Sequence, residues 1–213
     1  MAGIFQTATD LFERGGWVMF PLTALALVSV CLSVERTLFF IAQHGPGSGR
    51  RIAGLVEALR EAPLERARAR AAEDRTLYGR LVSLLLSKEP KPPATSGPLA
   101  QALAERARRP FERFAAAHGA IIAAAPMLGI LGTVTGIIDS FGLIGADETI
   151  ADPSLVAAGI SEALFTTAFG LTVALITLFP YAIFRVQTER ALDRIELIGA
   201  TAVARAEPTT AGS

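Results

Sequence analysis

Three long apolar stretches interrupt an otherwise charged chain. They cover residues 15–34, 114–138 and 163–184, and none of them contains Asp, Glu, Lys or Arg. A helix needs about 20 apolar residues to cross the hydrocarbon core of a bilayer, and each stretch reaches that length. The pattern therefore predicts an all-α integral membrane protein with three transmembrane helices.

The polar regions also have a helical pattern, which predicts long cytoplasmic helical extensions of the spans. Residues 50–86 place apolar side chains at helical spacing and are rich in Ala, Arg and Glu. Residues 88–98, KEPKPPATSGP, have the composition of a linker. A second helical pattern begins at Leu99 and is expected to run into the second span, with Pro110 as a kink. The tail is expected to continue the helix of the third span.

The distribution of basic residues predicts the orientation in the membrane. Residues 43–117 hold fourteen of the twenty Lys and Arg, and four more follow the third span. The loop 142–154 has none and contains Asp147, Glu148 and Asp152. Because cytoplasmic loops carry an excess of Lys and Arg, we expect residues 43–117 and the C-terminus in the cytoplasm, and the N-terminus and the acidic loop on the other side.

Spans and orientation together divide the chain into seven expected segments. They are a periplasmic arm at 1–14, a transmembrane helix at 15–42, a cytoplasmic helical segment at 43–109 with the linker at 88–98, a transmembrane helix with a cytoplasmic extension at 110–145, a periplasmic loop at 146–153, a transmembrane helix at 154–186, and a cytoplasmic tail at 187–213. The lipid bilayer is thus the first partner that the sequence implies.

Composition agrees with a membrane protein and argues against several other classes. Of the 213 residues 51% are apolar, and the mean hydropathy is +0.44, which is too apolar for an ordinary soluble domain. The many arginines are interleaved with glutamates, so a solvated helix face is favoured over a nucleic-acid partner. The sequence has no phosphate-cradling glycine motif and no His pair at metal spacing. We therefore expect no cofactor, no metal and no enzymatic activity.

One carboxylate stands out in the third span. Glu162 is the only charged residue between Asp152 and Arg185, and counting about 20 residues back from Tyr181 places it near the outer edge of the hydrocarbon. It is either wetted at headgroup level or faces a bundle interior or a water-filled cavity. The apolar residues 155–160 before it favour the second interpretation. A carboxyl group in such a cavity can hold and release a proton.

Small residues in the second and third spans predict close helix packing. Glycine costs about 1 kcal/mol relative to alanine in a helix, and small residues four positions apart let helix backbones approach in lipid. The glycines expected to pack are Gly129, Gly132, Gly136 and Gly170.

Hydroxyl side chains lie close to these glycines. Thr133 is in the second span, and Thr166 and Thr167 follow Glu162 by about one turn. A threonine in a membrane helix commonly bonds back to its own helix, so the hydroxyls alone do not show a function.

Taken together, these segments resemble a known family. "APMLGILGTVTGIIDSF" and "GISEALFTTAFGLTVA" are similar to the two signature helices of the MotA/TolQ/ExbB proton-channel family, and "SVERTLFF" resembles the end of its first span. The resemblance covers roughly residues 15–42 and 110–190. Three spans, rather than four with a larger cytoplasmic domain, are typical of the ExbB/TolQ branch.

The resemblance implies a subunit of a proton-driven motor in the bacterial inner membrane. Such subunits form a homo-oligomeric ring, usually a pentamer, around single-span partners of the ExbD or TolR type that contribute a membrane aspartate. Proton flow drives motion that passes to a periplasmic protein of the TonB or TolA type. ExbB-like energising of transport is favoured, and a TolQ-like role in envelope integrity stays open.

The resemblance also assigns residues to the proton pathway. The family's span-two threonine falls on Thr133, its span-three glutamate on Glu162 and its span-three threonine on Thr167. Thr166 is a secondary candidate beside them.

Two positions depart from the family pattern. Asp139 replaces an expected neutral residue, and either adds a second carboxylate to an outer vestibule or ends its helix in water; we favour the helix end. Phe169 stands where a small or polar residue is common, and either narrows a pore or faces lipid.

Other functions remain to be weighed against a proton channel. A non-conducting structural scaffold would use the same glycines and threonines only to pack helices. An intramembrane enzyme would need a Ser/Lys, Ser/His or metal-binding constellation, which the spans lack. Three helices cannot enclose a lumen by themselves, so a channel requires oligomerisation.

Overall fold

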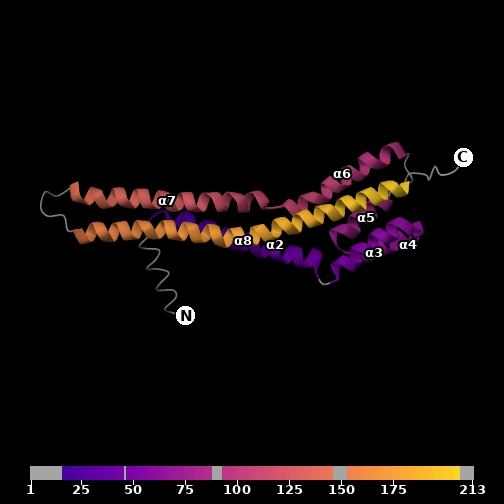
Figure 1. The fold of residues 1–213 in the computed structure, drawn as a ribbon, viewed down its shortest axis with the longest axis horizontal. Coiled ribbons are helices and arrows are strands. Elements are labelled where there is room, and N and C mark those ends of the chain that lie inside the picture. Colours follow the sequence, from indigo (N-terminus) through magenta and orange to yellow (C-terminus); the bar gives the residue numbers. More distant parts are fainter. Residues whose placement is uncertain (1–15, 46, 88–92, 146–152, 207–213) are drawn as a thin grey trace. The chain divides into compact units, whose positions relative to one another are not determined.

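The computed structural model describes residues 16–45, 47–87, 93–145 and 153–206, and all secondary structure in these residues is helical (Figure 1). The helices are α2 (Met19–His44), α3 (Ser48–Glu61), α4 (Leu64–Glu73), α5 (Leu77–Ser87), α6 (Pro93–Glu112), α7 (Ala115–Gly145) and α8 (Pro153–Ala206). Three apolar stretches, in α2, α7 and α8, are long enough to cross a membrane. The predicted all-α fold with three transmembrane helices is confirmed.

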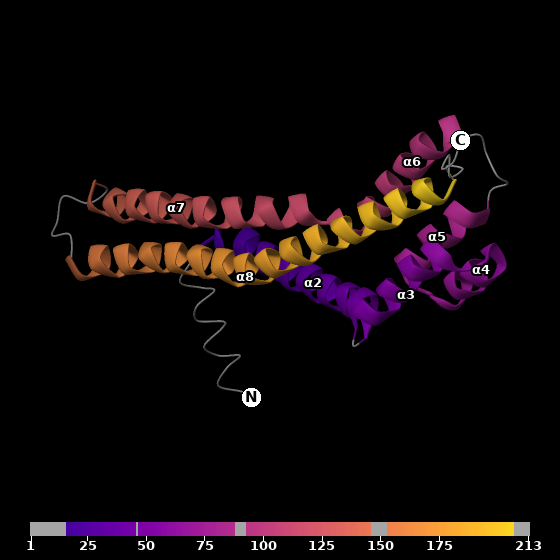
Figure 2. The ribbon, with the colours of Figure 1, turned by 45° about the vertical axis from the view of Figure 1, so that its right-hand side comes forward.

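The chain forms two compact units, here called unit 1 and unit 2. Unit 1 comprises residues 1–35 and 114–182, and unit 2 comprises residues 36–113 and 183–213. Unit 1 contains α7 and the N-terminal parts of α2 and α8, and α7 runs beside that part of α8 in both views (Figures 1 and 2). Unit 2 contains α3 to α6 and the C-terminal parts of α2 and α8.

Unit 1 is built from helices that are apolar on all sides. Its buried cluster consists of Val18, Met19, Leu22, Ile121, Ala125, Val173 and Ala174. Large apolar side chains such as Ile138, Leu164 and Phe179 are exposed on the outer faces. A helix that is apolar all round is typical of a membrane span.

Unit 2 is built from shorter amphipathic helices. α3 buries Ile52, Leu55 and Leu59 on one face, the spacing expected of a helix against a core. The rings of Phe40 and Phe184 stack at 5.8 Å in the same core. The predicted helical region 50–86 is thus divided among three helices.

Two predicted boundaries differ from the structure. α6 begins at Pro93, so residues 93–98 of the expected linker are helical; proline is well tolerated at the first helical position because its missing N–H would have no partner there. Pro110 itself lies inside α6, and the helix is interrupted only after it, at residues 113–114, before the second span. α6 ends at Glu112 and α7 begins at Ala115, and between them Phe114 has φ 67°.

The prediction that the tail continues the helix of the third span is confirmed, because α8 runs as one helix to Ala206. The expected arm at 1–14 and the expected loop at 146–153, except Pro153 at the start of α8, lie outside the described residues.

Candidate functional site

Glycines bring α7 and α8 into backbone contact. A Cβ atom placed on Gly129 would lie 2.9 Å from the Cα of Thr167, and one on Gly136 would lie 2.8 Å from the Cβ of Ala163. Real Cβ atoms essentially never approach other atoms below 3.0 Å. Neither position therefore has room for a larger residue.

Two further glycines belong to the same contact. A Cβ on Gly132 would lie 2.8 Å from the Cβ of Thr166, and one on Gly170 would lie 2.5 Å from the carbonyl oxygen of Ala125. All four glycines predicted to pack helices face the chain's own neighbouring helix. Their small-residue face is therefore occupied within the subunit.

A pocket of about 210 Å³ opens in unit 1 between α7, α8 and the residues that precede α2. Its lining comes from the chain just before α2, from the later turns of α7 and from the early turns of α8. The lining residues are Gly16, Trp17, Val18, Gly132, Thr135, Gly136, Asp139, Ser140, Gly159, Glu162, Ala163 and Thr166. Apolar spanning helices here border a partly open pocket that contains carboxylate and hydroxyl side chains.

Both carboxylates of this region line the pocket. Glu162 on α8 is partly buried, and Asp139 on α7 is exposed. α7 continues past Asp139 to Gly145, so the favoured expectation that Asp139 ends its helix is wrong. Across the described ranges, no group of three His, Cys, Asp or Glu side chains could hold a metal ion.

Three hydroxyl groups of the lining donate their protons to the backbone. Thr166 is 2% exposed and bonds the carbonyl of Ala163 at 2.7 Å. Thr135 bonds its own helix at 3.0 Å and Ser140 does so at 2.7 Å. A hydroxyl has one proton and two lone pairs, so these oxygens can accept hydrogen bonds from water or from a protonated carboxyl group.

The other two predicted pathway residues do not line this pocket. Thr167 donates to the carbonyl of Gly129 on α7 at 2.8 Å, and Thr133 donates to Ile130 of its own helix at 2.6 Å. Glu162 and Thr167 are five residues apart, which separates their directions around a helix by about 140°. Glu162 and Thr167 therefore point to different sides of α8.

An apolar cluster lies between the pocket and the next pair of buried hydroxyls in unit 1. About 16 Å of helix separates Thr166 from the next buried hydroxyl on α8, Thr177, which lies 2.6 Å from Ser29. The unit 1 apolar cluster fills this interval, and Phe169 packs against it. Phe169 thus contacts the interior of unit 1, whereas the sequence left a pore or lipid as its surroundings.

Some lining residues were not among the sequence candidates. Thr135 and Ser140 carry hydroxyls to the pocket, and Trp17, which is 59% exposed, forms part of its wall. Side chains four residues apart lie on the same helix face. Thr135 and Asp139 have this spacing on α7, and Glu162 and Thr166 have it on α8. That repeated spacing was a usable signal for Thr135, whereas nothing local indicated Trp17.

Comparison with known proteins gives the family. Residues 68–197 match the MotA/TolQ/ExbB proton channel family. The chain is 32% identical over 203 residues to biopolymer transport protein ExbB-like 1 of Synechocystis sp., which covers 92% of this chain and 79% of that protein. It is 34% identical over 174 residues to ExbB-like 3 of the same organism, covering 80% of this chain and 81% of that protein.

A third relative matches over a shorter part of the chain. The biopolymer transport protein ExbB homolog of Methanothermobacter thermautotrophicus is 45% identical over 78 residues, which cover 37% of this chain and 27% of that protein. The family consists of transport proteins and not of enzymes, in agreement with the sequence prediction. With its three apolar helices and its match over most of the chain, this multi-pass membrane protein belongs to the MotA/TolQ/ExbB proton channel family.

Proposed function

We propose that this chain is the ring-forming subunit of a proton-driven motor in the bacterial inner membrane. The observation that carries the proposal is the hydroxyl-lined pocket that holds Glu162 between spanning helices. An ionisable residue within membrane helices is costly and generally marks an ion or proton pathway. A scaffold whose helices only pack would not require this carboxylate.

In the proposed mechanism Glu162 takes up a proton at the outer mouth of the pathway. The oxygens of Thr135 and Thr166 accept hydrogen bonds there, because their own protons are committed to the backbone. The apolar cluster of unit 1 then blocks further movement through the subunit. The proton must therefore pass to a group outside this chain, and a membrane aspartate of a single-span ExbD- or TolR-like partner fits that requirement.

A ring of subunits supplies the surface on which the partner acts. Large apolar side chains remain exposed along α7 and α8 of the isolated subunit, and contacts with lipid, neighbouring subunits and the partner would cover them. We assign Thr133 and Thr167 to the part of this surface that faces the partner. A pentamer is the expected ring.

Orientation in the membrane follows from charge. The segment 43–117 holds fourteen of the twenty Lys and Arg residues, which supports a cytoplasmic location for it and for the C-terminus. The pocket of Glu162 then opens toward the periplasm. One elementary charge that crosses the membrane releases about 2.3 kcal/mol per 100 mV, which is the energy available to each step.

The energised process is proposed from the relatives. Two proteins that match most of this chain are named biopolymer transport proteins. We therefore favour ExbB-like energising of transport through a TonB- or TolA-like periplasmic protein over a TolQ-like role in envelope integrity.

Substitution of Glu162 tests the proposal. Glu162→Gln keeps the size of the side chain but cannot ionise, and should abolish function that depends on the proton motive force while the ring still assembles. Glu162→Asp keeps the charge with a shorter reach and should retain part of the function. Asp139→Asn is the matched control, because it removes the other carboxylate of the same pocket.

The measurement is activity in a strain that lacks the chromosomal copy, with assembly followed by native mass spectrometry. Wild-type activity of Glu162→Gln would overturn the assignment and favour a scaffold or a pathway that depends on the partner alone. Loss of activity in Asp139→Asn but not in Glu162→Gln would move the proton site to Asp139.

A further inference from the structure

Arginine side chains meet the C-terminal ends of three helices in unit 2. At the end of α3, Arg205 of α8 donates from Nη1 to the carbonyl of Leu59 at 2.8 Å and from Nη2 to the carbonyl of Ala62 at 2.8 Å. The carbonyl of Ala58 lies 3.3 Å from Nη1. One guanidinium thus contacts two carbonyl oxygens in the last turn of α3 and the carbonyl oxygen of its C-cap residue, Ala62.

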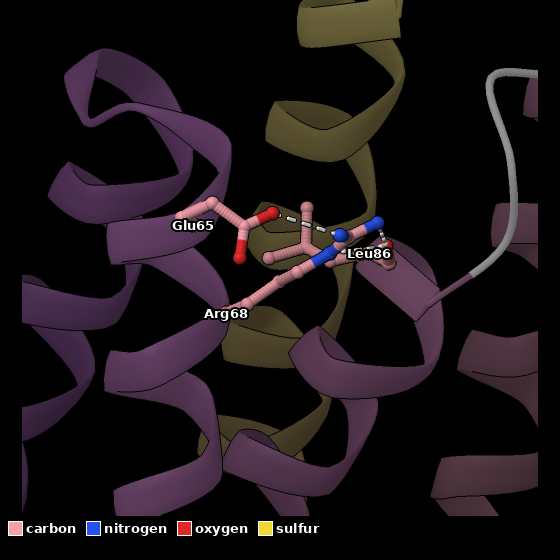
Figure 3. A network of polar contacts seen from close by, with 3 residues as sticks. All are labelled: Glu65, Arg68 and Leu86. Atoms are coloured by element: carbon pink, nitrogen blue, oxygen red, sulfur yellow. Dashed lines mark hydrogen bonds and ion pairs between the residues drawn. The ribbon is translucent and has the colours of Figure 1, made fainter.

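The second contact joins α4 to α5. Figure 3 shows Arg68 of α4 with its guanidinium directed at the carbonyl of Leu86 near the end of α5, and the distances are 3.2 Å from Nε and 3.0 Å from Nη2. Nη1 of the same side chain bonds Glu65 at 3.0 Å. The glutamate is largely exposed, and an exposed ion pair contributes little stability, so the contact with the helix end is the more important one.

The third contact joins α2 to α6. Arg36 of α2 is 3% exposed, donates from Nη1 to the carbonyl of Pro110 at 2.8 Å, and lies over the ring of Phe39 at 4.4 Å. Thr188 of α8 donates to the neighbouring carbonyl of Phe111 at 3.2 Å. Both acceptors belong to the last turn of α6, just before the positive φ of Phe114.

These contacts have a common physical basis. The last four carbonyls of a helix have no partner within the helix, and the helix C-terminus carries a partial negative charge that favours cations. Arginine offers five N–H donors in a planar fork. A guanidinium at a helix C-terminus donates hydrogen bonds to the free carbonyls and places a positive charge at the negative end of the helix dipole. It also fixes the helix that bears the arginine against the helix whose end it binds.

We propose that Arg36 and Arg205 are positioning residues of the motor. They lie on α2 and α8: the early turns of α8 line the pocket of Glu162, and α2 directly follows Gly16, Trp17 and Val18, which line it as well. By binding the ends of α6 and α3, they stop α2 and α8 from sliding or turning within unit 2. That functional consequence rests on the proposed function, whereas the contacts themselves do not.

Arg68 provides a matched control within the same unit. It makes the same kind of contact, but it joins α4 to α5, and neither of these helices contributes to the pocket. Its loss should loosen one helix end without moving α2 or α8. The comparison therefore separates a general effect of helix capping from an effect on the spanning helices.

The experiment compares Arg36→Met, Arg205→Met and Arg68→Met in the full chain, expressed with its membrane complex. Amide hydrogen exchange is measured over the last turns of α3, α5 and α6, together with activity that depends on the proton motive force. Each substitution should raise the amide exchange rate about tenfold or more, as expected when a charged hydrogen bond is lost. The increase should be confined to the last turn of the helix whose carbonyls that arginine binds. Activity should fall in the Arg36 and Arg205 variants and not in the Arg68 variant. Arg36→Lys and Arg205→Lys keep a donor and should recover part of both signals.

Several results would overturn the proposal. Unchanged exchange in Arg36→Met and Arg205→Met would show that these arginines do not hold the helix ends. Faster exchange throughout unit 2 would show that they are needed only for folding. Local loosening with full activity, or an equal activity loss in Arg68→Met, would remove the positioning role. Full activity of Glu162→Gln would instead contradict the proposed function and leave the exchange results intact.

Discussion

Gly129→Ala is the sharpest test of how α7 and α8 are packed. The added Cβ would lie 2.9 Å from the Cα of Thr167 and 3.0 Å from the carbonyl oxygen of Thr166. Both are backbone atoms, so no side-chain rotation relieves the collision and the helices must separate. Separation also weakens the bond from the Thr167 hydroxyl to the Gly129 carbonyl.

The expected loss of stability follows from three contributions. Overpacking costs about 1–3 kcal/mol, and a lost interhelical hydrogen bond in a membrane costs about 0.6 kcal/mol. Alanine regains about 1 kcal/mol of helix propensity. The net effect is a destabilisation of about 0.6–2.6 kcal/mol.

Unfolding in detergent, followed by circular dichroism, measures this change. Gly119→Ala is the matched control, because it lies on the same helix and its Cβ would meet no atom within 4 Å. That variant should match the wild-type protein or exceed its stability. If Gly129→Ala were as stable as Gly119→Ala, the close contact of α7 with α8 would be refuted.

Two further predictions concern the threonines and the orientation. Thr167→Val should lower the free energy of unfolding by about 0.6 kcal/mol because the Thr167 hydroxyl bridges two helices, whereas Thr133→Val should leave it nearly unchanged because the Thr133 hydroxyl bonds its own helix. Both variants should lose less activity than Glu162→Gln. A loss of activity in Thr133→Val as large as that in Glu162→Gln would contradict the roles assigned. A cysteine at the exposed Arg60, in a Cys31→Ala background, should react with a membrane-impermeant maleimide only after the inner membrane is opened. Labelling from the periplasmic side of intact cells would reverse the proposed topology.

The parts of the fold that sequence could predict are those with local causes. The three spans follow from the length of uninterrupted apolar runs, and the long α8 follows from a helical pattern without a break. The glycines of α7 were expected to pack because nothing else explains several poor helix formers in one span. Their partner, the same chain's α8, depends on tertiary structure and was not indicated by their spacing.

The break before α7 could not be predicted because its causes are distant in the sequence. Pro110 suggested a kink, but the helix ends at Glu112 and restarts after Phe114. Arg36 on α2 and Thr188 on α8 supply donors to the carbonyls at that end. Neither residue lies within 70 positions of the carbonyl that it caps.

The pocket was only partly predictable for a similar reason. Glu162 was found because a lone carboxylate in an apolar span is rare, and Asp139 was noticed but expected to end its helix. Placing them in one pocket requires the antiparallel pairing of α7 with α8 and the arrival of Trp17 from the start of the chain. Helical geometry alone could have shown that Glu162 and Thr167 point to different sides of α8.

Proton flux through the purified complex tests the central claim most directly. The chain would be co-expressed with its single-span partner, reconstituted into liposomes, and exposed to a membrane potential while internal pH is recorded. We predict proton uptake with the wild-type chain and no uptake above that of empty liposomes with Glu162→Gln at equal ring assembly. Equal uptake by both proteins would contradict the assignment of Glu162 as the proton site.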